Sequence, residues 1–412
     1  MSEVFCGFAQ TPLIMGDIKK LLGIAALLLS VSIPCAPSYN IAEPAAVIQE
    51  FTQATASENE LSVNDQTDVV LYEETTVESE GDEGETESLD IQYLLFLQDF
   101  RNSINDAWTP FMEFVSTFAT RYLILAVLFI YWAVNKRDGL YSIASMCLTL
   151  AVNQLIKLTA CVYRPWIRDA RIVPAGDSIT SATGYSFPSG HTATAAPQFG
   201  GMAATCGRKN RLFPVLCILA TLLIGFSRNY LGVHTPQDVF VAICESVLCL
   251  IVMHKIFSYI ELHPEKEDLF LLAGILFGAV SLVYITFKPY PMTYVDGKLL
   301  VDPQKMMNDG YGDIAFLIAF CIGRYIERRW IRFEPTGINI PGILLWAVGG
   351  VIFVLLNNNI GKLLDTMLGS HWGHFARRMI TILYYTALYP LIIKLVMNHI
   401  RASDGSADEK PE

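Results

Sequence analysis

Apolar residues dominate the chain after residue 109, where stretches of roughly 20 residues recur between short polar segments. A helix of that length crosses the hydrocarbon core of a bilayer, because it rises about 1.5 Å per residue. The pattern therefore predicts an all-α, polytopic transmembrane bundle. The predicted spans cover residues 110–134, 139–158, 189–206, 212–229, 236–257, 268–287, 312–326, 341–360 and 376–398.

Loop charges predict how the bundle is oriented. Basic residues gather in alternate loops, and the positive-inside rule makes these loops cytoplasmic. They hold Lys136-Arg137, Arg208–Arg211, Lys255 with Lys266, and Arg324–Arg332. The other loops, which include residues 164–188 and 228–236, then face outward. We therefore expect an integral protein of a bacterial plasma membrane.

The amino-terminal part has a different pattern. Lys19-Lys20 followed by the apolar run 21–33 predicts a signal peptide, with an uncleaved signal anchor as the alternative. Residues 40–90 contain many Asp and Glu and no Lys or Arg, which predicts a disordered acidic linker. Residues 89–108 mix apolar and charged positions, which favours an amphipathic helix on the outer surface near the active site.

Overall composition agrees with a membrane protein. Of 412 residues, 52% are hydrophobic and only 17% are charged. The formal net charge of -11 argues against binding to nucleic acid. The nine cysteines lie mostly in apolar spans and give no disulfide framework.

Three polar blocks stand out against this apolar background, and all lie at predicted outward-facing loops. They combine three fixed cations, two histidines and one carboxylate, which suits phosphoryl transfer. The blocks are Lys157 with Arg164-Pro165, Pro188-Ser189-Gly190-His191, and Ser227-Arg228 with His234 and Asp238.

The cations and the glycine suit binding of a phosphate group. The planar donor forks of Arg164 and Arg228 match phosphate oxygens, and Lys157 adds a point charge. Ser189 and Gly190 precede a run of small residues that indicates the start of a helix. Free backbone N–H groups at such a start favour an anion, and glycine lets the backbone approach it closely.

The two histidines can divide the remaining work. Asp238 follows His234 by four residues, and a carboxylate on one ring nitrogen presents the other nitrogen for attack. We therefore assign His234 as nucleophile, Asp238 as the group that orients it, and His191 as general acid. Hard-metal carboxylate clusters do not accompany these residues, so we expect neither a metal nor another cofactor.

Each polar residue also has a structural interpretation. Ser189 alone fits an N-cap, Asp238 fits a capping box with Thr235, and Arg164 fits an interfacial arginine. The combination favours catalysis over these separate explanations. Three further polar features are interpreted as helix-packing or capping groups: Asn357–Asn359, Glu245 and Asp313.

The three blocks, in this order and spacing, resemble the signature of the type 2 phosphatidic acid phosphatase superfamily. The resemblance implies a six-helix membrane core with a carboxy-terminal helical extension. It also implies that Lys157, Arg164, Ser189, Gly190 and Arg228 bind phosphate, and that His234 forms a phosphohistidine. The expected organisation is a signal peptide or anchor (1–38), a linker (39–90), a catalytic core (91–260), further helices (261–400) and a polar tail (401–412).

The expected activity is hydrolysis of a lipid phosphate monoester or pyrophosphate at the extracytoplasmic face. A lipid phosphotransferase could use the same site, because access of an acceptor decides between the two reactions. A non-catalytic lipid-binding or transport relative is the third possibility. The expected partner is a lipid phosphate in the membrane, and the sequence does not indicate an oligomeric state.

Overall fold

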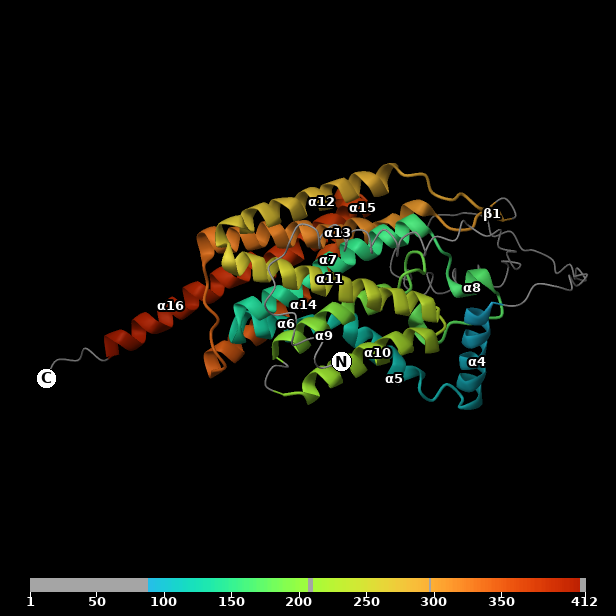
Figure 1. Cartoon of the computed structure of the whole chain (residues 1–412), viewed down its shortest axis with the longest axis horizontal. Helices are drawn as coiled ribbons and strands as arrows, with labels where there is room; N and C mark the ends of the chain where they lie inside the picture. The colour runs from blue at the N-terminus through green and yellow to red at the C-terminus, as the bar shows by residue number, and fades with distance from the viewer. Residues whose placement is uncertain (1–87, 207–209, 296–297, 408–412) are drawn as a thin grey trace, which may run out of the picture.

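The computed structural model of the chain describes residues 88–206, 210–295 and 298–407. The predicted signal segment and nearly all of the predicted linker lie outside these residues. The described part is an elongated helical bundle, which confirms the predicted all-α polytopic fold (Figure 1). A short antiparallel hairpin of β1 (Tyr294–Val295) and β2 (Lys298–Leu299) lies at one end.

Thirteen α-helices form this part of the chain, and π-helical turns at Ile130–Val134, Glu327–Ile331 and Tyr384–Leu388 continue three of them. The helices are α4 (Leu89–Ser103), α5 (Thr109–Arg121), α6 (Leu123–Phe129), α7 (Lys136–Ala160), α8 (Pro165–Arg168), α9 (Gly190–Cys206), α10 (Leu212–Tyr230), α11 (Pro236–Leu262), α12 (Glu267–Phe287), α13 (Pro303–Ile326), α14 (Ile340–Leu368), α15 (Ser370–Leu383) and α16 (Tyr389–Ala407).

Seven helical stretches of the described residues are long and apolar enough to cross a membrane. They are Thr109–Val134, Lys136–Arg168, Leu212–Tyr230, Pro236–Leu262, Pro264–Phe287, Ile340–Leu368 and Ser370–Arg401. The predicted spans 189–206 and 312–326 form α9 and α13, which run through the same bundle but do not meet this criterion (Figure 1). Both are enclosed by other helices, so their surfaces do not have to be apolar all round.

Helix α4 lies across one end of the bundle, as expected for an amphipathic surface helix (Figure 1). Ile91, Leu94 and Leu97 are buried on its inner face. The guanidinium of Arg101 donates hydrogen bonds to the carbonyls of Tyr230 (3.2 Å) and Val173 (2.7 Å). These bonds hold α4 against the loops that carry the polar blocks.

The opposite end of the bundle carries a network of ion pairs. Arg324 Nε lies 2.7 Å from Glu267 Oε1, and Lys136 Nζ lies 2.6 Å from Glu327 Oε1. Arg328 also pairs with Glu267, at 3.0 Å. The network joins the ends of α7, α12 and α13, and it brings three of the predicted cytoplasmic segments to the same end.

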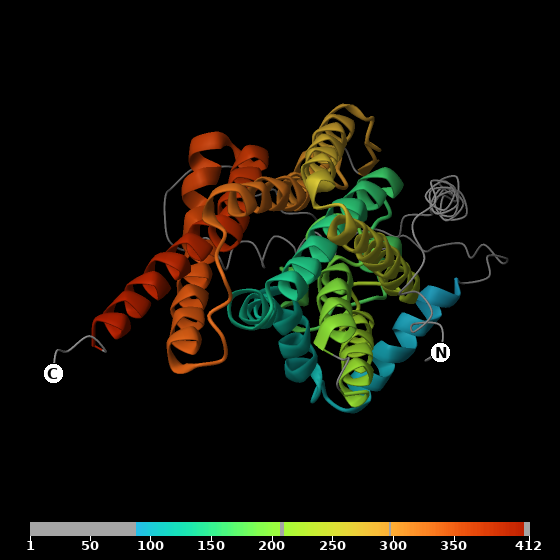
Figure 2. The same cartoon turned by 60° about the vertical axis from the view of Figure 1, so that its left-hand side comes forward.

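Helices α12–α16 form a second group beside helices α5–α11, and α13 makes the main contact between the groups (Figure 2). Gly310 permits a close approach there, because a Cβ at this position would lie 2.6 Å from the Leu158 side chain. The cavity described below lies along this contact.

Candidate active site

The fold brings the three polar blocks together at the end of the bundle that α4 covers. Lys157 lies in the last turn of α7, and Arg164 follows at the start of a long loop that ends at α9. Arg228 lies in the last turn of α10, and His234 lies in the short connection to α11. The side chains of Lys157, Arg164, Arg228 and His234 are all buried.

His234 is held from both sides of its ring. Its Nδ1 lies 3.1 Å from Asp238 Oδ2, and its Nε2 lies 3.0 Å from Arg164 Nη1. Arginine can only donate, so Nε2 must be the acceptor and Nδ1 must carry the proton that Asp238 accepts. This tautomer leaves an unprotonated Nε2 lone pair facing the cations.

Hydrogen bonds also fix the carboxylate of Asp238, which holds the ring of His234. Its Oδ2 also accepts hydrogen bonds from the hydroxyl of Ser186 (2.5 Å) and the backbone N–H of Thr235 (2.9 Å). Thr235 Oγ1 in turn accepts from the backbone of Asp238, which completes the predicted capping box at the start of α11. The structural and the orienting interpretations of Asp238 are therefore both satisfied by one carboxylate.

The three cations differ in how their donors are used. Lys157 Nζ donates to the carbonyls of Pro188 (2.6 Å) and Tyr185 (3.2 Å). Arg164 donates to the carbonyls of Thr183, Gly184 and Val233 as well as to His234.

Arg228 is the cation with open donors. Its Nη1 donates to Ser116 Oγ (2.6 Å), while Nε and Nη2 have no partner among the described residues. A buried guanidinium with two open donors is costly unless an anion completes it.

Gly190 begins α9, as the sequence predicted, and open space lies where its Cβ would be. Ser189 caps this helix: its Oγ accepts from the hydroxyl of Thr192 at 3.0 Å. His191 follows in the first turn, and its ring has no hydrogen-bond partner within the described ranges. The helix start thus presents backbone N–H groups and a free imidazole to the same space.

Burial and the neighbouring charges of Arg164, Arg228 and Lys157 hold the pKa of His234 well below its ordinary value of 6.5. The ring is therefore neutral at pH 7, as attack by a nitrogen lone pair requires.

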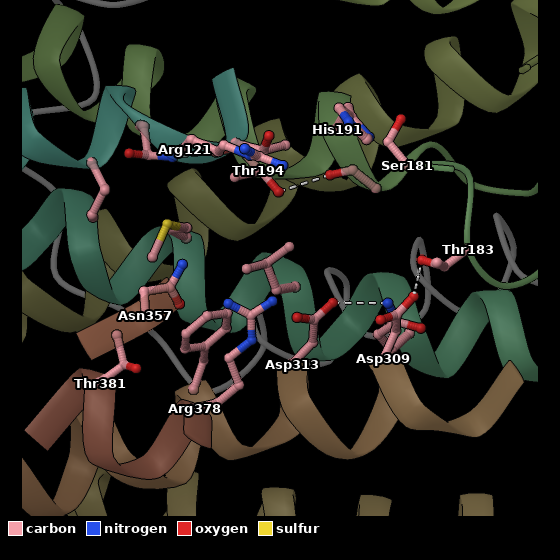
Figure 3. A pocket seen from close by; sticks show the side chains of 18 of the residues that line it. Arg121, Ser181, Thr183, His191, Thr194, Asp309, Asp313, Asn357, Arg378 and Thr381 are labelled. Atoms are coloured by element: carbon pink, nitrogen blue, oxygen red, sulfur yellow. Dashed lines mark hydrogen bonds between the residues drawn. The ribbon is translucent and has the colours of Figure 1, made fainter. Parts of the chain in front are cut away.

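A cavity of about 200 Å³ connects these residues with the second group of helices (Figure 3). Five of the eight predicted site residues line it: Lys157, Arg164, Gly190, His191 and His234. Ser189, Arg228 and Asp238 do not line this cavity. Asp238 is hydrogen-bonded to His234, the charge of Arg228 acts on His234, and Ser189 directly precedes Gly190.

The cavity wall also contains residues that the sequence did not single out for the site. Asp309, Asp313, Asn357, Arg378 and Tyr385 come from α13, α14, α15 and the π-helical turn that follows α15. Asp313 and Asn357 were interpreted as packing or capping groups. Asp313 does join two helices, since it accepts a hydrogen bond from Gln154 of α7 at 2.8 Å, and both residues also line the cavity (Figure 3). Glu245 does serve packing, since it accepts a hydrogen bond from the amide of Asn153.

The fold is that of a membrane-embedded helical protein, and the family matches make it a member of a phosphatase superfamily. Residues 138–261 match the family model of the PAP2 superfamily, and residues 311–398 match that of the PAP2 superfamily phosphatase, transmembrane extension. The chain belongs to the type 2 phosphatidic acid phosphatase (PAP2) superfamily. Searches of the curated proteins and of the solved structures gave no significant match.

Proposed function

We propose that this chain hydrolyses a lipid phosphate monoester or pyrophosphate through a phosphohistidine formed on His234, without a metal ion. The observation that carries the proposal is the ring of His234 between Asp238 and Arg164, because it fixes the tautomer in which Nε2 is a nucleophile. Membership of a phosphatase superfamily supports the same reaction class.

The reaction has two steps. First, Nε2 of His234 bonds to phosphorus while the bond to the leaving oxygen breaks, and protonated His191 gives that oxygen its proton. Asp238 stabilises the positive charge that develops on the ring. Second, water attacks the phosphohistidine, His191 accepts a proton from that water, and His234 is released.

The cations stabilise the charge that spreads over the phosphoryl oxygens in both steps. Arg228 has two donor atoms without a partner among the described residues, and Gly190 begins α9, where free backbone N–H groups favour an anion. Among the described residues, no group of three or more His, Cys, Asp and Glu side chains could hold a metal ion.

The active site is proposed to face outward. Its residues lie at the end of the bundle opposite the ion-pair network of Lys136, Arg324 and Arg328, and the positive-inside rule makes the network end cytoplasmic. A lipid substrate would then come from the outer leaflet.

Phosphate release by the purified protein tests the proposal. Candidate substrates are phosphatidic acid, phosphatidylglycerol phosphate, polyprenyl pyrophosphate and a sphingoid-base phosphate in detergent micelles, each with and without EDTA. We expect release from at least one of them at an unchanged rate in EDTA. Activity that EDTA abolishes and magnesium restores would overturn the metal-independent mechanism.

A parallel reaction with an added lipid acceptor distinguishes hydrolysis from phosphotransfer. Hydrolysis releases inorganic phosphate in equal amount to the substrate consumed. Phosphotransfer leaves phosphate release below substrate consumption and yields a phosphorylated acceptor, so that product would replace the hydrolase proposal with the transferase.

A further inference from the structure

Helix α5 lies beside α10 and outside the two segments that match the PAP2 family models (Figure 1). The residues that it buries recur every three or four positions, so they form one stripe along the helix. They are Thr109, Met112, Ser116 and Ala119. Ser116 lies between Met112 and Ala119 in this stripe and is only 3% exposed. A buried hydroxyl costs free energy unless it is hydrogen-bonded, so the partner of Ser116 indicates what a serine does at this position.

The partner of Ser116 is Arg228, in the last turn of α10. Ser116 Oγ accepts a hydrogen bond from Arg228 Nη1 at 2.6 Å, and the arginine is 1% exposed. The other two guanidinium nitrogens, Nε and Nη2, have no partner within the described part of the chain. Ser116 is therefore the hydrogen-bond partner that orients this guanidinium.

Packing and a hydrogen bond hold α5 in the register that places Ser116 opposite Arg228. Met112, one turn before Ser116, belongs to the same hydrophobic cluster as Tyr230 and Val233, in the segment that joins α10 to α11. Glu113 accepts a hydrogen bond at 2.6 Å from a backbone N–H of the loop between α8 and α9. These contacts tie α5 to the segments that carry the catalytic residues.

The nitrogens of a guanidinium do not suit a phosphate group equally. The N–H bonds of Nε and Nη2 run parallel along one edge, and this pair matches two oxygens of one phosphoryl group. In Arg228 the serine occupies Nη1, so both donors of the other edge stay available. The charge of Arg228 acts on both His191 and His234, which places the guanidinium near the two reacting rings.

We propose that Ser116 is a positioning residue, which orients Arg228 so that the edge formed by Nε and Nη2 binds the transferred phosphoryl group. The proposal rests on the proposed phosphatase activity and adds a residue of α5 to the same site. Ser116 acts through Arg228 and does not touch the phosphoryl group. Because the guanidinium is held before the anion binds, less side-chain entropy is lost on binding.

Binding of orthovanadate to the purified full-length protein in detergent micelles tests this role. Isothermal titration calorimetry reports the stoichiometry and the Kd separately, so the Kd does not depend on the fraction that folds. Ser116→Ala should raise the Kd about tenfold, because the anion then has to order Arg228. Ser116→Cys keeps the shape of the side chain but offers only a weak acceptor, so it should raise the Kd as well.

The matched control is Ser246→Ala. Ser246 is also buried, but its hydroxyl donates to the carbonyl of Ala242 in its own helix, α11. We expect its Kd to stay within twofold of the wild-type value. Equal effects of Ser116→Ala and Ser246→Ala would contradict the proposal.

A double-mutant cycle separates positioning of Arg228 from a general loss of packing. In an Arg228→Ala background the hydrogen bond is already absent, so Ser116→Ala should change the Kd less than twofold. A further tenfold increase there would show that Ser116 does not act through Arg228. An unchanged Kd in Ser116→Ala would overturn the positioning role and leave the phosphatase intact. Wild-type protein that neither binds vanadate nor releases phosphate from any substrate would reject the phosphatase activity, and the role of Ser116 with it.

Discussion

At the scale of single residues, His234 shows how neighbouring hydrogen bonds decide a chemical role. Asp238 and Arg164 contact opposite nitrogens of the ring, so its tautomer does not depend on the substrate. His191 in contrast has no such partner in the described part of the chain, and its ring is free to exchange a proton. This asymmetry motivates two predictions.

Loss of each histidine should affect different substrates. His234→Ala removes the nucleophile, so we expect phosphate release from every substrate and the acid-labile phosphoenzyme to fall at least 100-fold. His191→Ala removes the proton donor, so an aryl phosphate with a good leaving group should lose far less activity than an alkyl lipid phosphate. Near wild-type turnover in His234→Ala, together with an inactive His191→Ala, would reverse the assigned roles.

The pH dependence should report the environment of His234. Because burial and three cations lower the pKa of this ring below 6.5, it stays neutral as the pH falls through 6.5 and becomes protonated only at lower pH. We expect the acid limb of kcat/KM to lie below pH 6.5, after correction for titration of the substrate phosphate. An acid limb of kcat/KM at or above pH 6.5 would contradict a lowered pKa of His234.

The candidate catalytic residues could be proposed from the sequence because their types and spacing do not depend on knowledge of the fold. Ser186 could not, although it donates to Asp238, because a serine in a loop has many ordinary explanations. Asn357 and Arg378 could not either. They are more than 120 residues from His191 and His234 in the chain, and only packing of α13–α15 on the core brings them to the cavity.

At the scale of elements, α4 is tied to the loops of the active site. Arg101 donates to the carbonyl of Tyr230, four residues before His234, and to that of Val173. Hydrophobic contacts of Ile91 and Leu94 with Ile172 add to this attachment. The amphipathic pattern predicted this helix but could not reveal which carbonyls hold it.

Removal of this attachment should loosen the helix. Arg101→Ala leaves two carbonyls without their charged donor, which should cost about 1.5–3 kcal/mol. We expect faster hydrogen–deuterium exchange in residues 89–103 and 171–175. Arg171→Ala is the matched control, since its ion pair with Asp169 is largely exposed and should matter little. Exchange that Arg101→Ala does not change would show that apolar packing alone holds α4.

Two predicted spans show that an apolar pattern predicts a helix but not whether other helices enclose it. Helices α9 and α13 were predicted from their apolar content, and both are present. The pattern did not show that other helices enclose them while α10 exposes Leu216, Leu219 and Leu222 on the bundle surface. Enclosure explains why α13 can carry Asp309 and Asp313 into the cavity.

At the scale of the whole molecule, the proposed orientation makes the active site accessible from outside the cell. Thr180 is exposed near the active site, and Asn210 is exposed in the loop between α9 and α10. In a background in which serine replaces every cysteine except the buried Cys147, Cys217, Cys249 and Cys321, Thr180→Cys should react in intact cells with a membrane-impermeant thiol reagent. Asn210→Cys should react only after the cells are permeabilised.

The opposite labelling pattern would place the active site in the cytoplasm. It would contradict the positive-inside rule for Lys136 and Arg324, and it would redirect the substrate search to lipids of the inner leaflet. Labelling of both positions in intact cells would indicate permeable cells, which a cytoplasmic marker protein controls for.

Arg324 and Arg328, at the end of the bundle opposite the active site, have one role during membrane insertion and another in the folded protein. In the proposed orientation, their charges are unpaired during insertion and resist translocation, so they help to set the direction of the nascent helices. After folding, Glu267 and Glu327 neutralise them, and the same guanidinium groups join α12 to α13. The positive charge that directs insertion is therefore neutralised by ion pairs in the folded protein. Loss of an acidic partner such as Glu267 should weaken the contact between α12 and α13 without reversing the membrane topology.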